Sequence, residues 1–243
     1  HFNSLIGHAN GETDFAGNVV FSMYSDNSGV FWIGTFVGLY KWNTQTTHSD
    51  HLVDKGDSKS LSSGSISMIG SDNNYTYIGT SKGLDVRDKK TGMVNTLPIQ
   101  SGDIPGLKEP VVMSFAYVNE EEVWIGYLGQ GATKYNPITN TYKHYAADKN
   151  NDKALATPGI TSILAASDNT VWFGTFSGGL SKYNRETDDF TTYWHDPTDI
   201  STISSNKVLT IHESRDGNLW LGTWDAGLNI FVPQTGTAFR ISH

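Results

Sequence analysis

Apolar and polar residues alternate over short stretches of this chain, and turn-forming residues separate the stretches. Near the C-terminus, for example, the alternation puts Leu228, Ile230 and Val232 on one face of an extended strand. Turn sequences such as Arg215-Asp216-Gly217-Asn218 stand between the stretches, because Gly and Asn tolerate a positive φ. This part of the chain is therefore predicted to form four strands, at 208–213, 219–223, 228–232 and 238–242. Helical periodicity is missing, so we expect almost no helix.

The same four-strand plan returns at a fixed period. Its marker is an aromatic residue followed by a β-former, Gly and usually Thr, then a loop that contains a second Gly. The marker aromatics stand at steps of 45, 47, 48 and 48 residues, and they are Trp32, Tyr77, Trp124, Trp172 and Trp220. A period in this range indicates an array of one small supersecondary unit.

A lone four-stranded sheet cannot bury both of its faces, and stacking such sheets radially solves the problem. We therefore predict an all-β fold, a β-propeller of four-stranded antiparallel blades that occupies residues 1–243 as one domain. Residues 1–7 are predicted to be an orphan outer strand. The five marker aromatics are predicted to lie in the core, because burying one Trp removes roughly 150–250 Å² from water. Five blades are expected, at about residues 18–50, 64–98, 111–145, 160–195 and 207–243.

Composition narrows the functional classes. The 243 residues carry 17 Lys and Arg against 25 Asp and Glu, a net charge of −8, which argues against a nucleic-acid partner. The chain has no cysteine, so disulfides, thiol nucleophiles and zinc–thiolate sites are excluded. No apolar run approaches the roughly 18 residues that a membrane helix needs, and we expect no membrane contact by this segment itself.

Motifs for catalysis or cofactor binding are missing from the sequence. There is no Gly-x-Ser-x-Gly elbow, no phosphate-binding Gly-Lys-Ser/Thr and no His-Glu-x-x-His. The histidines His48, His144 and His195 are expected on or beside the outer strands of different blades, far from one another. We therefore predict no catalytic residue, no metal and no cofactor in this chain.

The repeat resembles the periplasmic regulator-propeller repeat of bacterial hybrid two-component sensor histidine kinases. That repeat has the form Asp-x-x-Gly-x-Leu-Trp-Ile-Gly-Thr-x-x-Gly-Gly-Leu-x-x-Tyr-Asn-x-x-Thr-x-x-Phe. Residues 216–228 and 171–190 match it closely, and the match covers essentially the whole chain. The second repeat departs from it with Tyr77 in place of Trp, and the third with Tyr127 in place of Thr and Ala132 in place of Leu.

The resemblance implies a ligand-sensing module of a two-component signalling protein, located in the periplasm, whose signal passes to a histidine kinase. Family members usually carry two tandem seven-bladed propellers, so five blades and an orphan strand suggest a piece of a longer array. A ring closed by five blades is left open, as is a homodimer. The expected partners are an oligosaccharide ligand and the rest of the sensor protein.

The candidate ligand site follows from strand order. In an antiparallel blade the loops between the second and third strands lie on one face of the propeller. These loops carry Phe36, Tyr127, Phe176 and Trp224, with Leu128 beside Tyr127 and Asp225 beside Trp224. Sugar rings stack on such aromatics and Asp binds hydroxyl groups, so we expect a ligand contact here. The alternative is that these side chains cap the central channel or contact another domain.

Two further functions are left open. Residues 25–32 resemble the Asp-box turn of sialidases and of some tandem-propeller endoglucanases, and a propeller glycosidase would need two carboxylates about 5–10 Å apart. The few arginines disfavour a sialidase. A protein-interaction scaffold is the other alternative. The carboxylates considered for a glycosidase are Asp54, Asp57, Asp148, Asp152, Asp196, Asp199 and Asp225.

Overall fold

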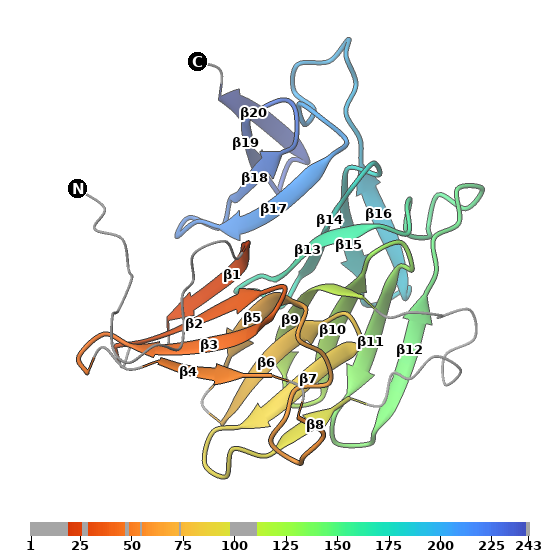
Figure 1. Ribbon diagram of the computed structural model, residues 1–243. Coiled ribbons are helices and arrows are strands. Elements are labelled where there is room, and N and C mark those ends of the chain that lie inside the picture. The colour runs from red at the N-terminus through yellow and green to blue at the C-terminus, as the bar shows by residue number, and fades with distance from the viewer. Residues whose placement is uncertain are drawn as a thin grey trace. The chain divides into compact units, whose positions relative to one another are not determined.

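The computed structural model describes residues 19–25, 29–46, 49–53, 55–72, 74–97 and 111–241. These residues form twenty β-strands and no helix, hence no helix that could cross a membrane. The strands make five four-stranded sheets, each built from four consecutive strands (Figure 1). The predicted all-β architecture of four-stranded antiparallel blades is confirmed. We number the sheets blade 1 to blade 5 in chain order.

The chain divides into two compact units, residues 1–112 and 113–243, and each is described by itself. Unit 1 holds blades 1 and 2. The predicted orphan strand at residues 1–7 lies outside the described residues. Blade 1 consists of β1 (Val20–Ser25), β2 (Val30–Thr35), β3 (Gly38–Asn43) and β4 (Ser49–Leu52), and blade 2 of β5 (Ile66–Ser71), β6 (Tyr75–Thr80), β7 (Gly83–Asp88) and β8 (Val94–Thr96).

Unit 2 holds blades 3, 4 and 5. The first strand of blade 3, β9, begins at Val112, which is the last residue of unit 1. Blade 3 consists of β9 (Val112–Asn119), β10 (Glu122–Tyr127), β11 (Ala132–Asn136) and β12 (Thr141–Tyr145). Blade 4 consists of β13 (Ile160–Ala165), β14 (Val171–Thr175), β15 (Leu180–Asn184) and β16 (Asp189–Tyr193). Blade 5 consists of β17 (Val208–Glu213), β18 (Leu219–Thr223), β19 (Leu228–Val232) and β20 (Thr237–Ile241).

Four of the five marker aromatics are buried, namely Trp32, Tyr77, Trp124 and Trp172. Within each unit, the third strand of the next blade covers the aromatic of the second strand. In unit 1 the guanidinium carbon of Arg87 lies 5.6 Å from the ring centroid of Trp32. In unit 2, Tyr183 and Phe231 take the same role. Their ring centroids lie 4.7 Å and 5.5 Å from those of Trp124 and Trp172, respectively.

Trp220 is an exception, and its predicted burial is wrong. Its side chain in β18 is 38% exposed. The physical reason is that a marker aromatic is covered by the blade that follows its own, and the described residues contain no blade after β20. Burial of the aromatic therefore depends on a neighbouring repeat as much as on the repeat that contains it.

The Gly and Thr of the marker have separate structural roles. A Cβ added to Gly126 would lie 2.5 Å from Cγ2 of Ile160, so only glycine lets the first strand of the next blade approach this closely. Thr175, at the end of β14, closes the following loop. Its hydroxyl donates to the carbonyl oxygen of Gly179 at 3.0 Å and accepts from the amide of Gly178 at 2.8 Å. The repeated Gly-Thr pair thus fixes both blade spacing and loop shape.

Candidate functional site

Three loops of unit 2 expose an apolar side chain at the same place in successive blades. These side chains are Leu128 after β10, Phe176 after β14 and Trp224 after β18. Trp224 is 68% exposed, although indole is among the largest apolar side chains. Exposed apolar groups that recur at one position of a repeat are candidates for a binding surface.

Backbone hydrogen bonds join these loops into one continuous surface, which we call the loop belt (residues 127–131, 158–159, 175–179, 206–207 and 223–227). The amide of Gly131 donates to Pro158 O at 2.7 Å, and the amide of Phe176 donates to Gly159 O at 3.0 Å. In the same way, Gly179 donates to Asn206 O at 2.8 Å. The amide of Trp224 donates to Lys207 O at 3.0 Å. The loops of blades 3 and 4 are thus tied to the linker before the next blade, and the loops of blades 4 and 5 to the linker before their own blade, so Leu128, Phe176 and Trp224 stand on one connected strip.

Tyr127 does not lie on this surface, so its predicted ligand contact is wrong. Its side chain is fully buried, and burial raises the pKa of its hydroxyl. Tyr127 ends β10 at the position where other blades have Thr35, Thr80 or Thr175, all of which are buried. Alternation along the strand points this residue inward, and the neighbouring Leu128 is the exposed one.

Asp225 lies on the loop belt beside Trp224, and its carboxylate is already paired. Oδ2 accepts from Lys207 Nζ at 2.6 Å, and Oδ1 accepts from Ser205 Oγ at 2.6 Å. The hydrogen bonds from Lys207 and Ser205 hold the pKa of Asp225 below its ordinary value. Asp225 is therefore ionised at neutral pH and keeps free lone pairs for a hydroxyl donor.

Phe36 belongs to unit 1, where it follows β2. Its ring is exposed and packs edge-on against Phe21 of β1, with the ring centroids 4.2 Å apart. In blade 2 the equivalent residue is Ser81, whose hydroxyl is 2.7 Å from that of Ser63. Within unit 1, therefore, blade 1 has an exposed aromatic residue at this loop position, Phe36, whereas blade 2 has a serine, Ser81.

The carboxylates considered for a glycosidase are held in turns, except Asp54, which lies outside the described residues. The pKa of Asp57 is lowered by hydrogen bonds from the amide of Lys59 and from Ser60. Hydroxyl groups of Thr198 and Ser201 lower the pKa values of Asp196 and Asp199. A general acid in glycoside hydrolysis needs a raised pKa. The pKa values of these three carboxyl groups and of Asp225 are lowered instead.

The histidines do not gather. His144 of β12 is half-buried, and its Nδ1 lies 3.0 Å from Thr133 Oγ1; burial lowers its pKa. His195 Nδ1 lies 2.8 Å from the carbonyl oxygen of Ile203, and His48 falls outside the described residues. Among the described residues, no group of three or more His, Asp or Glu side chains has the arrangement of a metal site.

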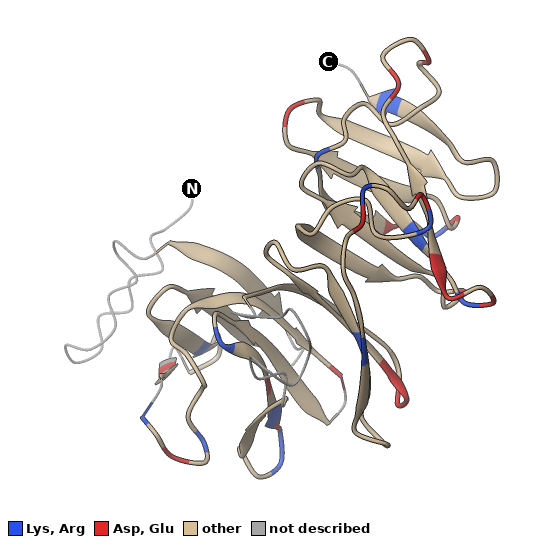
Figure 2. Cartoon of the chain, turned by 90° about the vertical axis from the view of Figure 1, so that its right-hand side faces the viewer, with Lys and Arg blue, Asp and Glu red and all other residues tan. Residues whose placement is uncertain are grey.

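An open groove of about 1150 Å³ lies in unit 2 along blade 4, and sequence reasoning did not predict it. The segment 148–154, β15, β16 and Trp194 form its walls. The segment is held against the edge of β16 by a bond from the amide of Phe190 to Lys153 O at 2.8 Å. Asp148 and Asp152 line this groove, and no residue of the loop belt lines it. The residues that line it include both acidic and basic ones, and the positions of such residues along the chain are coloured in Figure 2.

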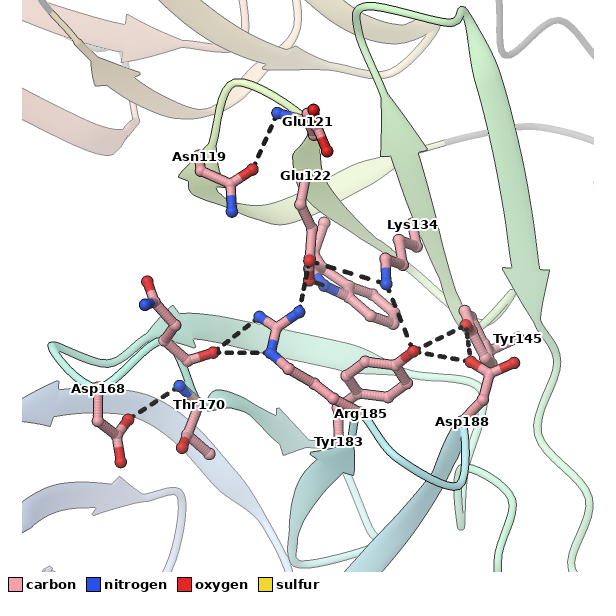
Figure 3. Close-up of polar contacts among 12 residues, drawn as sticks. Asn119, Glu121, Glu122, Lys134, Tyr145, Asp168, Thr170, Tyr183, Arg185 and Asp188 are labelled. Carbon is pink, nitrogen blue, oxygen red and sulfur yellow. Dashed lines mark hydrogen bonds and ion pairs between the residues drawn. The ribbon is translucent and has the colours of Figure 1, made fainter.

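A polar network centred on the buried Glu122 joins blades 3 and 4 at the opposite end of the strands from the loop belt (Figure 3). Glu122 Oε1 accepts from Trp124 Nε1 at 2.6 Å, and Oε2 accepts from Arg185 at 2.5 Å. Burial alone would raise the pKa of Glu122, but Arg185, Trp124 and Lys134 lower it overall. The carboxylate is thus fully used in holding the two blades together, so we assign it no catalytic role.

Asp188 is the second acid of this network. Its carboxylate accepts from the hydroxyl groups of Tyr145 at 2.5 Å and Tyr183 at 2.7 Å, and it also pairs with Lys143. Burial alone would raise its pKa, but these hydrogen bonds outweigh that effect and lower the pKa from 3.8 to about 2. A pKa lowered by folding means that the ionised form stabilises the native state.

We expect this stabilisation to be present above pH 4 and to disappear as the pH falls from about 4 to 2. Asp188→Asn should therefore lower the urea midpoint at pH 7, while at pH 2 the variant and the parent chain should unfold alike. Urea titrations at several pH values, followed by far-UV circular dichroism, measure the difference. A difference that persists unchanged at pH 2 would contradict the assignment to the Asp188 carboxylate.

Comparison with known proteins identifies the repeat. A model of the two-component regulator propeller family matches residues 14–36 and 202–225, which contain the markers of blades 1 and 5. These two segments are similar to two-component regulator propeller repeats. No curated protein sequence matches the chain significantly. The match thus falls on parts of blades 1 and 5, and the loop belt lies on the second-to-third-strand loops of blades 3, 4 and 5.

Solved structures show the same fold. The extracellular domain of the putative one component system BT4673 from B. thetaiotaomicron is 23% identical, with a TM-score of 0.73 over 97% of this chain. The extracellular domain of the putative hybrid two component system BT3049 from the same organism is 20% identical, again with a TM-score of 0.73 over 97% of the chain. The chain spans 29% and 30% of the lengths of these two domains.

A more distant neighbour is virginiamycin B lyase from Staphylococcus aureus. It is 15% identical, with a TM-score of 0.66, and the match covers 93% of this chain and 71% of the lyase. At these identities the likeness to all three proteins shows the fold alone. The relatives in two-component systems and the lyase thus share a propeller architecture with this chain, and function has to be argued from its own residues.

Proposed function

We propose that this chain is the ligand-binding part of a periplasmic sensor that signals to a histidine kinase, and that its ligand is a neutral oligosaccharide. The match to regulator propeller repeats supports the sensing role. The observation that carries the ligand proposal is the loop belt, where an indole that is 68% exposed stands beside an ionised carboxylate.

The loop belt offers the two kinds of contact that a sugar needs. The faces of Trp224 and Phe176 are exposed for the C–H groups of pyranose rings, and burying an aromatic face contributes through apolar area as well as through ring geometry. Asp225 accepts hydrogen bonds from sugar hydroxyl groups while Lys207 and Ser205 hold it in place. The connected strip of Leu128, Phe176 and Trp224 runs across three blades, which suits an extended chain of sugars.

Charge favours a neutral ligand. The chain has a net charge of −8, and Lys207, the cation nearest Trp224 among the residues of the loop belt, is already paired with Asp225. A sulfated or uronic-acid-rich glycan would meet repulsion that only a free basic cluster could offset. We therefore expect gluco-, xylo- or manno-oligosaccharides to bind more tightly than anionic ones of the same length.

Isothermal titration calorimetry with this panel of oligosaccharides tests the proposal. Trp224→Ala should weaken binding at least about tenfold, which corresponds to about 1.4 kcal/mol. Trp194→Ala is the matched control, because Trp194 is also exposed but lies in the groove of blade 4. Loss of binding in Trp194→Ala with normal binding in Trp224→Ala would move the site to the groove. No binding by any oligosaccharide would overturn the ligand proposal.

A further inference from the structure

The ammonium group of Lys207 and the carboxylate of Asp225 form a surface ion pair on the loop belt that keeps free hydrogen-bonding capacity. Lys207 Nζ lies 2.6 Å from Asp225 Oδ2, and the two side chains are 48% and 43% exposed. An ammonium group has three donors, of which Asp225 takes one, and each carboxylate oxygen has a second lone pair. The pair therefore presents donors and acceptors side by side at the surface.

Both members of the pair are fixed to the backbone around them. The carbonyl oxygen of Lys207 accepts from the amide of Trp224 at 3.0 Å, and the amide of Lys207 donates to Ser205 Oγ at 3.1 Å. The hydroxyl group of Ser205 donates in turn to Asp225 Oδ1 at 2.6 Å. Because the two charged side chains are held before a ligand arrives, binding costs less side-chain entropy than at a mobile surface pair.

A buried amide holds the linker that carries Lys207. Asn229 of β19 is fully buried. Its Oδ1 accepts from the amide of Ser204 at 2.9 Å, and its Nδ2 donates to Ser204 Oγ at 2.8 Å. Ser204 Oγ also donates to the carbonyl oxygen of Ala226 at 3.0 Å. Asn229 thus connects the linker before blade 5 to the loop that contains Asp225, and this connection fixes the place of both charged groups.

Blades 2 and 4 tie the same loop to the same linker position by the backbone. In blades 2, 4 and 5 the loop after the second strand donates one amide hydrogen bond to the linker before that blade. The acceptors are the carbonyl oxygens of Ser65, Gly159 and Lys207, respectively. Ser65 and Gly159 carry no charge, so neither can form the ion pair that Lys207 forms. The backbone connection therefore exists without it.

Neutral hydroxyl groups join the linker and the loop in blades 2 and 4. The hydroxyl oxygens of Ser63 and Ser81 are 2.7 Å apart in blade 2, and those of Thr157 and Ser177 are 3.3 Å apart in blade 4. An exposed ion pair adds little to stability. Since two blades are built in the same way without charges, the ion pair of blade 5 is not needed for the fold and is available for a ligand.

We propose that the Lys207–Asp225 pair binds two adjacent hydroxyl groups of one sugar ring, an inference that rests on the proposed function. One hydroxyl group donates to Asp225, and the oxygen of its neighbour accepts from Lys207. The face of the same ring lies on Trp224. Adjacent gauche hydroxyl groups of a pyranose place their oxygens about one hydrogen-bond length apart, which matches the separation of Nζ and Oδ2.

This geometry selects the linkage of the oligosaccharide. Gluco-, xylo- and manno-oligosaccharides linked through O4 keep the adjacent O2 and O3 hydroxyl groups free in every internal ring. In chains of the same sugars linked through O3, the linked oxygen lies between the two free hydroxyl groups of each internal ring, so no adjacent pair remains. The site is therefore expected to prefer O4-linked chains.

Isothermal titration calorimetry with pairs of hexasaccharides of one sugar, linked through O4 or through O3, tests the inference. The parent chain should bind the O4-linked isomer about tenfold more tightly, the effect of one hydrogen bond to a charged group. Lys207→Met keeps the aliphatic stem and should bind both isomers alike. Lys153→Met is the matched control, because Lys153 also lies in a linker and pairs with an aspartate, Asp189, at 3.5 Å, but lies outside the loop belt. This control should keep the full preference.

Asp225→Asn tests the other member of the pair. It should lose the preference as Lys207→Met does, and the double variant should lose no more, because both groups act on one ring. Equal binding of both isomers by the parent chain, or an unchanged preference in Lys207→Met, would overturn the inference and leave the proposed function standing. If no hexasaccharide of the three sugars binds, the proposed function and this inference fail together.

Discussion

Replacing Trp124 with alanine is expected to lower the free energy of unfolding by about 3–5 kcal/mol, the range for large-to-small changes at buried aromatic positions. The Trp124 side chain is fully buried. Its ring centroid lies 5.1 Å from those of Tyr145 and Phe173, and 4.7 Å from that of Tyr183. The change leaves a cavity at the centre of the blade 3–blade 4 core. It also removes the indole donor from Glu122, so a buried carboxylate loses a partner.

Urea unfolding followed by far-UV circular dichroism measures this loss. Trp220→Ala is the matched control, because Trp220 holds the same repeat position but is 38% exposed, and we expect it to cost less than about 1.5 kcal/mol. Trp124→Phe keeps most of the ring and removes the donor, so it should fall between the two alanine variants. If Trp124→Ala and Trp220→Ala cost the same, the interface between blades is not what buries the aromatic.

The comparison of these two tryptophans shows what the sequence can predict. The period and the alternation were enough to predict four-stranded blades and to mark the aromatic of each second strand. They could not reveal that Trp220 is exposed, because its own repeat keeps the marker pattern of an aromatic residue, an apolar residue, Gly and Thr. Exposure of a marker aromatic is decided by the following blade, and a local pattern contains no information about that blade.

The candidate site residues show a second limit of what the sequence can predict. Phe176 and Trp224 could be placed on the loop surface from strand order alone, since a side chain just after the end of a strand is free of the sheet. Tyr127 could not be placed by its aromatic character. The usable signal was its register: it replaces the buried Thr that ends the second strand, so it points inward as Thr175 does. At the end of a strand, the register of a residue decides whether its side chain points inward, even when the residue type suggests a surface position.

The groove along blade 4 had no signal in the repeat pattern. It arises because the segment 148–154, which lies between two blades, folds back on the edge of β16 through the bond from Phe190 to Lys153. Linkers of this kind vary in length and composition between repeats, and nothing in their local sequence says which strand edge they will reach. Tertiary contacts of a linker are therefore learned from the structure.

Gly179→Ala is expected to destabilise unit 2 by about 2–4 kcal/mol, through two additive costs. Gly179 has a φ of +71°, a left-handed conformation that costs an L-residue about 1 kcal/mol or more. The added Cβ would also collide with the carbonyl oxygen of Tyr193, which is backbone and cannot turn aside. The collision would displace the loop whose amide bonds to Asn206, and with it the loop belt between Phe176 and Trp224.

Gly217→Ala separates the two costs. Gly217 has a φ of +79°, close to that of Gly179, but a Cβ there would meet nothing within 4 Å. Its alanine variant should therefore show the backbone strain alone, about 1 kcal/mol. The difference between the two urea midpoints measures the collision with Tyr193.

The collision acts on the loop belt, so Gly179→Ala should also weaken oligosaccharide binding. Gly217→Ala should leave binding unchanged, because Gly217 lies in the turn between the first two strands of blade 5. Equal midpoints for the two variants would mean that the loop after β14 yields freely, and a loop that yields freely could not hold Phe176 in a fixed position for a sugar.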